Sequence, residues 1–347
     1  MLTIGVDPHK DTHTAAAVDA VGDERSHRTQ PARREGFGAL LIWARDLDTD
    51  RVWVIEDCRH VSGPLERFLI DRGETVARLA PHLMAGARRG ARTRGKSDPI
   101  DALAIAHAAL RVGVHSLPAA RLAGPELEIR QLVCHRQRLI AARTRLINEL
   151  RWQLHDLWPD WEIPRRCLSG TSWQHQVKHR LRNAPTSAIV RIARDELRRI
   201  IDLTRTINQL HRELAGLVAH RAPQLLAQPG CGVICAAKLI GEIAGIHRFA
   251  NDAKLARMAG CAPIPVSSGR TDRHRLDHGG NRQLNHAVHL LAICRIRHDP
   301  NTAAYIQKQR QTGKTSREAI RNLKRHLIRH IYQLLTHPPT NPQTIHC

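Results

Sequence analysis

The stretch LTIGVDPHKDTHTAAAVDAVGDERSHRT, residues 2–29, sets the fold that the sequence predicts. Residues 2–7 form a short apolar run that ends on Asp7, and residues 12–29 continue as two more extended segments around a turn at 21–23. Short apolar runs that are bounded by turn residues are typical of buried strands. We therefore expect three consecutive strands at the start of the chain.

Helical and extended patterns alternate after these strands. Strands are expected over 51–57, with Glu56 at the strand end, and over 75–80. Helices are expected over 34–47, 63–73 and 98–110, the last with Pro99 in its first turn. Three strands followed by alternating helix and strand is the order of a ribonuclease H-like fold, and we expect this α/β domain to span residues 1–115.

Residues 123–221 have the pattern of long paired helices. Leu132, Leu139 and Leu146 are seven residues apart, and apolar residues recur at intervals of four and three over 203–217. This heptad-like spacing predicts a coiled coil, formed within the chain or between two copies.

Three further segments complete the predicted organisation. An irregular insertion with prolines and tryptophans, at about 158–186, separates the two long helices. Residues 223–335 are expected to form a mainly α-helical domain, and the proline-rich tail 336–347 is expected to be disordered.

The charge of the chain favours a polyanionic partner. Lys and Arg number 54 against 32 Asp and Glu, which gives a formal net charge of +22. Neutralising phosphates releases condensed counterions, so nucleic acid is the expected ligand. Charge alone names no activity, because ribosomal-type and membrane-surface proteins can also be this basic.

The cysteines and the hydropathy point to an intracellular protein. The eight cysteines include no C-x-x-C pair, which argues against a zinc site and favours reduced thiols. No run approaches the roughly 18 apolar residues of a membrane span. We expect a cytoplasmic, nucleoid-associated protein with no membrane partner.

Four carboxylates could form a metal site. Asp98 and Asp101 lie three apart at the start of a helix. Asp98 could instead serve as the N-cap, and the helix dipole would favour the charge of Asp101 in the first turn. Asp7 and Glu56 lie at the ends of apolar strands, which is an unusual place for an unpaired carboxylate. Four acids gathered at one sheet edge would bind two Mg²⁺ ions for phosphoryl transfer. The alternatives are a strand-end turn for Asp7 and an ion pair with Arg59 for Glu56.

Basic segments could contact the nucleic acid. Five cations precede Asp98 in a segment that three glycines interrupt, so we expect a mobile contact there: Arg88, Arg89, Arg92, Arg94 and Lys96. The turn that contains Gly230 and Gly232 resembles a helix-hairpin-helix, whose backbone amides hold a phosphate, or it is a plain interhelical turn.

A serine lies beside a further basic cluster. Ser268 and Gly269 follow an extended, proline-punctuated stretch, and four arginines come after them: Arg270, Arg273, Arg275 and Arg282. Such a serine could attack a phosphodiester. The alternative is a flexible basic DNA-binding turn.

These motifs together resemble one family. The carboxylates occur in GVDPHKDTH, VIED and SDPIDALAIA, and the C-terminal motifs are QPGCG…GEIAG and AGCAPIPVSSGR…GGNRQL. In this order, from about residue 2 to 335, they resemble the DEDD-type transposases of insertion-sequence family 110, to which the Piv-type invertases are related. In one place the chain departs from many relatives: it has Glu56-Asp57-Cys58-Arg59 where they read Glu-Ala-Thr-Gly, so Asp57 competes with Glu56 as the second acid.

The resemblance implies a fold and a reaction. It implies a RuvC-like N-terminal domain, a coiled-coil middle and a C-terminal transposase domain. It places Asp7, Glu56, Asp98 and Asp101 on the metal-binding acids and Ser268, rather than Ser267, on the nucleophile. The expected activity is recombination through a covalent phosphoserine, which moves an insertion sequence. The expected partners are DNA, as element ends and target, a structured guide RNA and further copies of the chain in a dimer or tetramer.

Two other functions remain open from the sequence. A RuvC-like structure-specific endonuclease would hydrolyse junctions with water, so it needs the acids but not Ser268. A non-catalytic DNA-binding protein would need neither.

Overall fold

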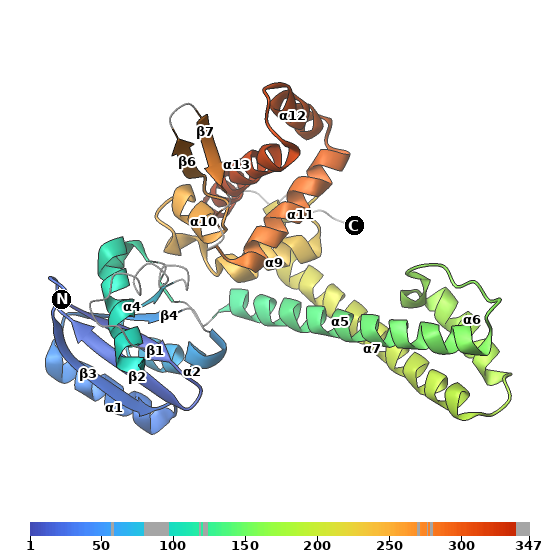
Figure 1. Ribbon diagram of the computed structural model, residues 1–347, viewed down its shortest axis with the longest axis horizontal. Helices are drawn as coiled ribbons and strands as arrows, with labels where there is room; N and C mark the ends of the chain where they lie inside the picture. Colours follow the sequence, from blue (N-terminus) through green and yellow to red (C-terminus); the bar gives the residue numbers. More distant parts are fainter. Residues whose placement is uncertain are drawn as a thin grey trace. The chain divides into compact units, whose positions relative to one another are not determined.

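A computed structural model describes most of the chain. The described residues are 1–56, 59–79, 97–117, 119–120, 124–268, 271–275, 277 and 280–337, without the side chains of 59–60, 116, 267–268 and 271–273. The chain divides into two compact units (Figure 1), one of residues 1–127 with 242–338 and the other built on residues 128–241.

The first unit contains a five-stranded sheet in the order β3-β2-β1-β4-β5. Its strands are β1 (Leu2–Pro8), β2 (Thr12–Val18), β3 (Glu24–Pro31), β4 (Arg51–Glu56) and β5 (Val76–Leu79). β1 pairs antiparallel with β2 and parallel with β4; β2 and β3 are antiparallel, and β4 and β5 are parallel. This mixed sheet, with its three leading antiparallel strands, is compatible with the predicted ribonuclease H-like domain.

Helices cover both faces of this sheet. They are α1 (Arg34–Leu47), α2 (Arg59–Ile70) and α4 (Asp98–Val112). Ile4 and Val6 of β1 pack in one apolar cluster with residues of α1 and α2, including Leu40. On the other face, Val54 of β4 packs with Ile105 and its neighbours on α4. Figure 1 shows α1 and α4 on opposite sides of the strands.

Gly5 allows β1 and α4 to approach closely. A Cβ atom at Gly5 would lie 2.3 Å from the carbonyl oxygen of Ala102 and 2.5 Å from the amide nitrogen of Ala106. Both neighbours are backbone atoms, so no side-chain rotation could relieve the clash. Residues alternate between the faces of a strand, so Asp7 lies on the same face as Gly5, the face that α4 covers.

The second unit contains two long antiparallel helices, α5 (Pro125–Leu157) and α7 (Ala188–Arg221). Gln153 donates a hydrogen bond to Glu196 at 2.9 Å, and Arg143 donates one to Thr204 at 3.2 Å. Later residues of α5 therefore contact earlier residues of α7. The two long helices are as predicted, whereas coiled-coil pairing stays a prediction. None of the described helices combines the length and the hydropathy that crossing a bilayer requires.

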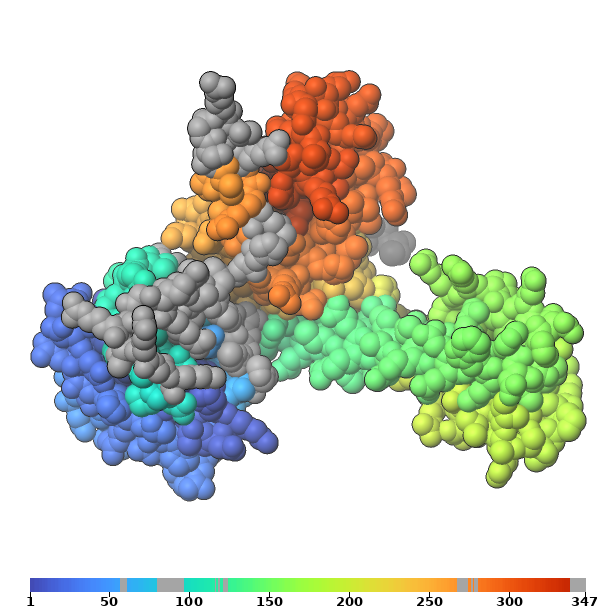
Figure 2. Space-filling view, in the orientation of Figure 1, coloured from blue at the N-terminus to red at the C-terminus, as the bar shows by residue number. Residues whose placement is uncertain are grey.

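The segment between these helices is more ordered than predicted. Instead of a wholly irregular insertion over 158–186, the structure has helix α6 (Thr171–Arg182) within it. Trp173, Val177 and Leu181 are spaced by four, and their apolar face packs into the core of the unit. The flanking prolines concealed this pattern. Figure 2 shows the segment around α6, in green and yellow-green, packed together with the adjoining parts of α5 and α7.

The remaining chain is mainly helical. Its elements are α8 (Pro223–Leu226), α9 (Val233–Ile243), α10 (Asp252–Met258), β6 (Ile264–Ser268), β7 (Thr271–Arg275), α11 (Arg282–His298), α12 (Pro300–Gln311) and α13 (Ser316–Thr336). β6 and β7 form an antiparallel hairpin, of which the sequence indicated only the first, extended half. Helix α13 includes the first residue of the tail that was expected to be disordered, and residues 338–347 of this tail lie outside the described residues.

The contact at Gly5 generates a stability prediction. Gly5→Ala should lower the free energy of unfolding by about 1–3 kcal/mol, because the new methyl group overlaps backbone atoms of α4. Urea denaturation, together with hydrogen exchange of the β1 amides, measures the loss. Gly38→Ala in α1 is the matched control, because a Cβ there meets nothing within 4 Å. Equal stability of the two variants would contradict the proposed role of Gly5.

Candidate active site

Asp7 is the buried centre of a polar group at the end of β1. Asp7 is only 7% exposed, and its Oδ2 accepts no hydrogen bond from the described residues. Nδ1 of His9 lies 3.6 Å from Oδ2 of Asp7 and 3.8 Å from Oδ2 of Asp98. One ligand atom from each of these three residues lies within 4.8 Å of the others. The structure thus brings Asp7 and Asp98 together from segments about 90 residues apart in sequence.

The first turn of α4 supplies two of the acids. Asp98 is the first residue of the helix, and Asp101 is buried at 7% exposure. The capping alternative for Asp98 is wrong, since Ser97 occupies the N-cap position and no side chain there makes a capping hydrogen bond. The amide of Asp101 donates to the carbonyl of Ser97 at 3.0 Å, as in an ordinary first turn. Asp98 therefore has no capping role that would explain its position beside Asp7.

Glu56 ends β4, the parallel neighbour of β1. Val6 and Ile55 are register partners, so the carboxyl ends of the two strands meet at one edge of the sheet. The Glu56 side chain is half-buried and close enough to act electrostatically on Asp7. Its competitor, Asp57, lies outside the described residues, as does the side chain of Arg59, its alternative ion-pair partner.

The electrostatics of Asp7 reflect this crowding. Burial raises the pKa of Asp7 to about 6 from an ordinary value of 3.8. His9 acts in the opposite direction, while the charges of Asp101, Glu56 and Asp98 raise the pKa further. The other three predicted acids therefore all lie close enough to act on Asp7.

His9 is a site residue that the sequence analysis did not identify. It lies two residues after Asp7, directly after the end of β1 at Pro8. The motif DPH carried that signal, but a histidine after a strand end is common on protein surfaces. The side chain of His9 is 52% exposed and lies between two carboxylates.

The donor set fits a divalent cation such as Mg²⁺. Mg²⁺ prefers carboxylate oxygens, and no described residue donates a hydrogen bond to the buried Oδ2 of Asp7 that would stabilise its charge. Imidazole suits Mg²⁺ less well than oxygen does, so His9 is better placed to orient the carboxylates than to bind the ion.

The C-terminal candidates lie on a hairpin and a turn. Ser268 is the last residue of β6 and pairs with Thr271, so it lies at the hairpin tip. Arg275 ends β7 and Arg282 begins α11, and both are exposed. Arg270 lies outside the described residues, and so does the side chain of Arg273.

The remaining nucleic-acid candidates are described only in part. Gly230 has a φ of 78°, which glycine adopts readily, in the turn that also contains Gly232 and precedes α9. The helix before this turn, α8, has four residues. The basic segment with Arg88, Arg89, Arg92, Arg94 and Lys96 lies in 80–96, outside the described residues.

The raised pKa of Asp7 predicts how stability depends on pH. The folded pKa of about 6 exceeds the unfolded value of 3.8, so ionisation of Asp7 disfavours the folded state. Below about pH 3 both states are protonated and the penalty is absent; it grows as the pH rises through the unfolded pKa of 3.8 and is complete above about pH 6. In metal-free protein at pH 7.5, Asp7→Asn should raise the free energy of unfolding by about 1–3 kcal/mol.

Denaturation at pH 4 and pH 7.5, with EDTA and with Mg²⁺, measures this effect. The advantage of Asp7→Asn should shrink to about 0.5 kcal/mol at pH 4, and Mg²⁺ should stabilise only the wild type. Asp46→Asn, at an exposed position of α1, is the control. It should change neither the free energy of unfolding nor the effect of Mg²⁺ on it. A wild type as stable as Asp7→Asn at pH 7.5, or equal stabilisation of both by Mg²⁺, would contradict the buried acid group.

Comparisons with known proteins identify the family of the chain. Residues 4–159, which contain the four acids, match the IS110 DEDD family model, described as "Transposase". Residues 222–307, which contain Ser268, match the model "Transposase IS116/IS110/IS902 family".

Relatives resemble nearly the whole chain. The IS110 43.6 kDa protein of Streptomyces coelicolor is 29% identical over 96% of this chain and 93% of its own. The IS116 44.8 kDa protein of Streptomyces clavuligerus is 26% identical over 96% of this chain and 94% of its own length. The IS900 42 kDa protein of Mycobacterium paratuberculosis is 28% identical over 88% of this chain and 86% of its own length. With both halves matching models of one family, the chain belongs to the IS110 family of DEDD transposases.

Proposed function

We propose that this transposase cuts and rejoins DNA by Mg²⁺-dependent transesterification through Ser268, with a structured RNA selecting the DNA. Its family makes the chain a DNA-cleaving and DNA-recombining enzyme. The observation that supports the finer proposal most strongly is the buried acid group, in which Asp7 lies beside Asp98 and is affected by Asp101 and Glu56. A stable fold gains nothing from gathering four carboxylates, so a function is the better explanation.

The proposed step exchanges one ester for another. The hydroxyl oxygen of Ser268 forms a bond to phosphorus, and a bond from phosphorus to a sugar oxygen breaks. The serine proton passes to a base, and the leaving sugar oxygen takes up a proton. Because a phosphodiester is retained, the reverse reaction with a new sugar hydroxyl rejoins the strand without an external energy source.

The chain's own residues divide the tasks. Asp7, Glu56, Asp98 and Asp101 would hold Mg²⁺, which stabilises negative charge on the phosphate oxygens when it is bound. A serine hydroxyl is a weak nucleophile at neutral pH and needs a base. The arginines near Ser268 can neutralise the phosphate but cannot accept its proton, whereas a carboxylate can.

The acids and the serine are expected to form one composite site. About 170 residues separate Asp98 from Ser268, and long helices lie between them in sequence. We propose assembly on nucleic acid, with a second copy of the chain able to supply the serine, in a dimer or tetramer. The net charge of +22 supports a protein that holds both DNA and RNA.

A structure-specific endonuclease is the second candidate. The acid group supports it equally, since water could replace the serine as the nucleophile. The non-catalytic alternative is less favoured, because a DNA-binding module has no use for the buried and destabilised Asp7.

Two substitutions separate these functions. On element-end DNA with the element-encoded RNA, Asp101→Asn and Ser268→Ala should each reduce strand exchange by at least about 10³-fold while DNA binding persists. Gel analysis of cleaved and exchanged strands measures this loss. Ser267→Ala is the matched control and should stay active.

The outcomes distinguish the candidates. Cleavage that survives in Ser268→Ala would favour the water-using nuclease, and activity that survives in Asp101→Asn would exclude the acid group from catalysis. Mixing the two inactive variants should restore exchange if the site is assembled in trans. No restoration would place the whole site within one chain.

A further inference from the structure

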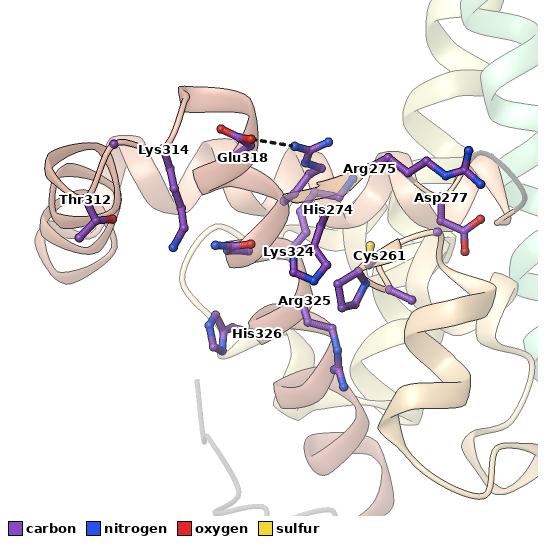
Figure 3. A pocket seen from close by; sticks show the side chains of 16 residues that line it. Cys261, His274, Arg275, Asp277, Thr312, Lys314, Glu318, Lys324, Arg325 and His326 are labelled. Carbon is purple, nitrogen blue, oxygen red and sulfur yellow. Dashed lines mark ion pairs between the residues drawn. The ribbon is translucent and has the colours of Figure 1, made fainter. Parts of the chain in front are cut away.

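A cavity of about 490 Å³ lies in the C-terminal part of the first unit, beside the base of the β6–β7 hairpin. Figure 3 shows its lining side chains, which come from β7, from α13 and from the loops before β6 and α13. The cations outnumber the two carboxylates, Asp277 and Glu318, in the lining. These cations are Arg275, Lys314, Arg321, Lys324 and Arg325.

Lys324 is the unusual member of this lining, because it is a lysine that is only 6% exposed. Its Nζ donates one hydrogen bond, to Oδ1 of Asn285 at 2.6 Å. An ammonium group has three donors. Among the residues that the structure describes, no carboxylate lies within ion-pair distance of this Nζ. A buried cation without a counterion is costly, so an anionic ligand is the expected partner.

Asn285 is fixed in the orientation that receives Lys324. Its Nδ2 donates to the carbonyls of Ala259 at 2.7 Å and Gly260 at 3.0 Å. The amide oxygen must therefore point the other way, to Lys324. Gly260 is itself held by Gly280, where a Cβ atom would lie 2.1 Å from the Gly260 nitrogen. Backbone contacts and hydrogen bonds thus position Asn285 in this wall of the cavity.

The two lining carboxylates have other partners. Glu318 accepts hydrogen bonds from the amide and the hydroxyl of Thr315, as the capping residue of α13, and Oδ2 of Asp277 lies 3.4 Å from Nε of Arg257. Neither forms an ion pair with Lys324. Within the described part of the chain, the Lys314 ammonium donates to a neutral amide oxygen, that of Gln309 at 2.6 Å, and forms no ion pair. Arg321 lies 3.8 Å from Glu318 and Arg325 lies 2.7 Å from Asp252, so each of these two arginines has a carboxylate partner. Positive charge still exceeds negative charge in the lining.

We propose that this cavity binds a phosphodiester group of the nucleic acid, with Lys324, Lys314 and Arg275 as its contacts. The inference rests on the proposed function and adds a second site at which the protein binds the nucleic-acid backbone. Arg275 ends the strand that begins at Thr271, the partner of Ser268. Four residues of strand span about 13 Å. This distance equals about four nucleotides of a nucleic-acid strand, at roughly 3.4 Å each. A phosphate bound in the cavity would therefore position the nucleic acid about four nucleotides from the hairpin tip.

The test measures binding rather than catalysis. The affinities of a 20-base-pair DNA duplex and of a single-stranded RNA are measured from 50 to 300 mM salt without Mg²⁺. Lys314→Gln and Lys324→Met should each weaken binding and lower the slope of log affinity against log salt, by about 0.9 for the duplex or about 0.7 for the single strand. Methionine keeps the aliphatic stem of Lys324, and thermal melting checks the fold.

Lys308→Gln, an exposed lysine on the neighbouring helix α12 that does not line the cavity, is the matched control and should leave the slope unchanged. If Lys324→Met fails to fold, Lys314→Gln and Arg275→Gln carry the test. A reduced salt slope with DNA or with RNA supports the site and shows which of the two nucleic acids supplies the phosphate. Unchanged slopes on both overturn the inference, even if DNA still binds. A wild type that binds no DNA contradicts the proposed function instead.

Discussion

The close contact between β1 and α4 at Gly5 determines where the catalytic candidates lie. A helix on a sheet is normally held away from it by side chains, but here the backbone of α4 reaches the strand itself. The register of this contact places the first turn of α4 beside the end of β1, so Asp98 comes to within 4.8 Å of Asp7 and His9. The parallel pairing of β1 with β4 then places Glu56 at the same edge.

Gathering these acids costs folding energy. Burial alone favours the neutral form of Asp7, and three nearby carboxylates add to the effect. The surrounding core, with fully buried residues such as Ile4, Trp53 and Ile105, stabilises the sheet despite this cost. Strain of this kind is expected where a site is organised for a ligand, here a cation.

The sequence predicted the N-terminal sheet well because its strands carry strong local signals. Apolar runs that stop at Asp7 and Glu56 are enough to place both acids at strand ends. The N-cap was misplaced by one residue, since Ser97 and Asp98 are both good capping residues. His9 was missed because its role depends on a tertiary neighbour, Asp98, and not on its own segment.

Elsewhere, long-range packing determines structure that the local sequence patterns do not predict. Helix α6 lies between prolines that suggest a loop, yet its apolar face is buried against α5 and α7. The strand β7 is rich in charge and forms only as the partner of β6. Lys324 lies on the apolar face of α13, four residues before Ile328, which marks it as unusual, but only the fold reveals the cavity that it lines.

We propose that the four acids and Ser268 exchange DNA strands through a covalent phosphoserine. The most direct test incubates the protein with its RNA, Mg²⁺ and a DNA end that carries a nick beside the cleavage site, so that rejoining cannot occur. Proteolysis and mass spectrometry then locate the attached nucleotide. The expected result is a nucleotide attached to Ser268 in the wild type and no attached nucleotide in Asp101→Asn. Cleaved DNA without any protein adduct, or an adduct on another residue, would contradict it.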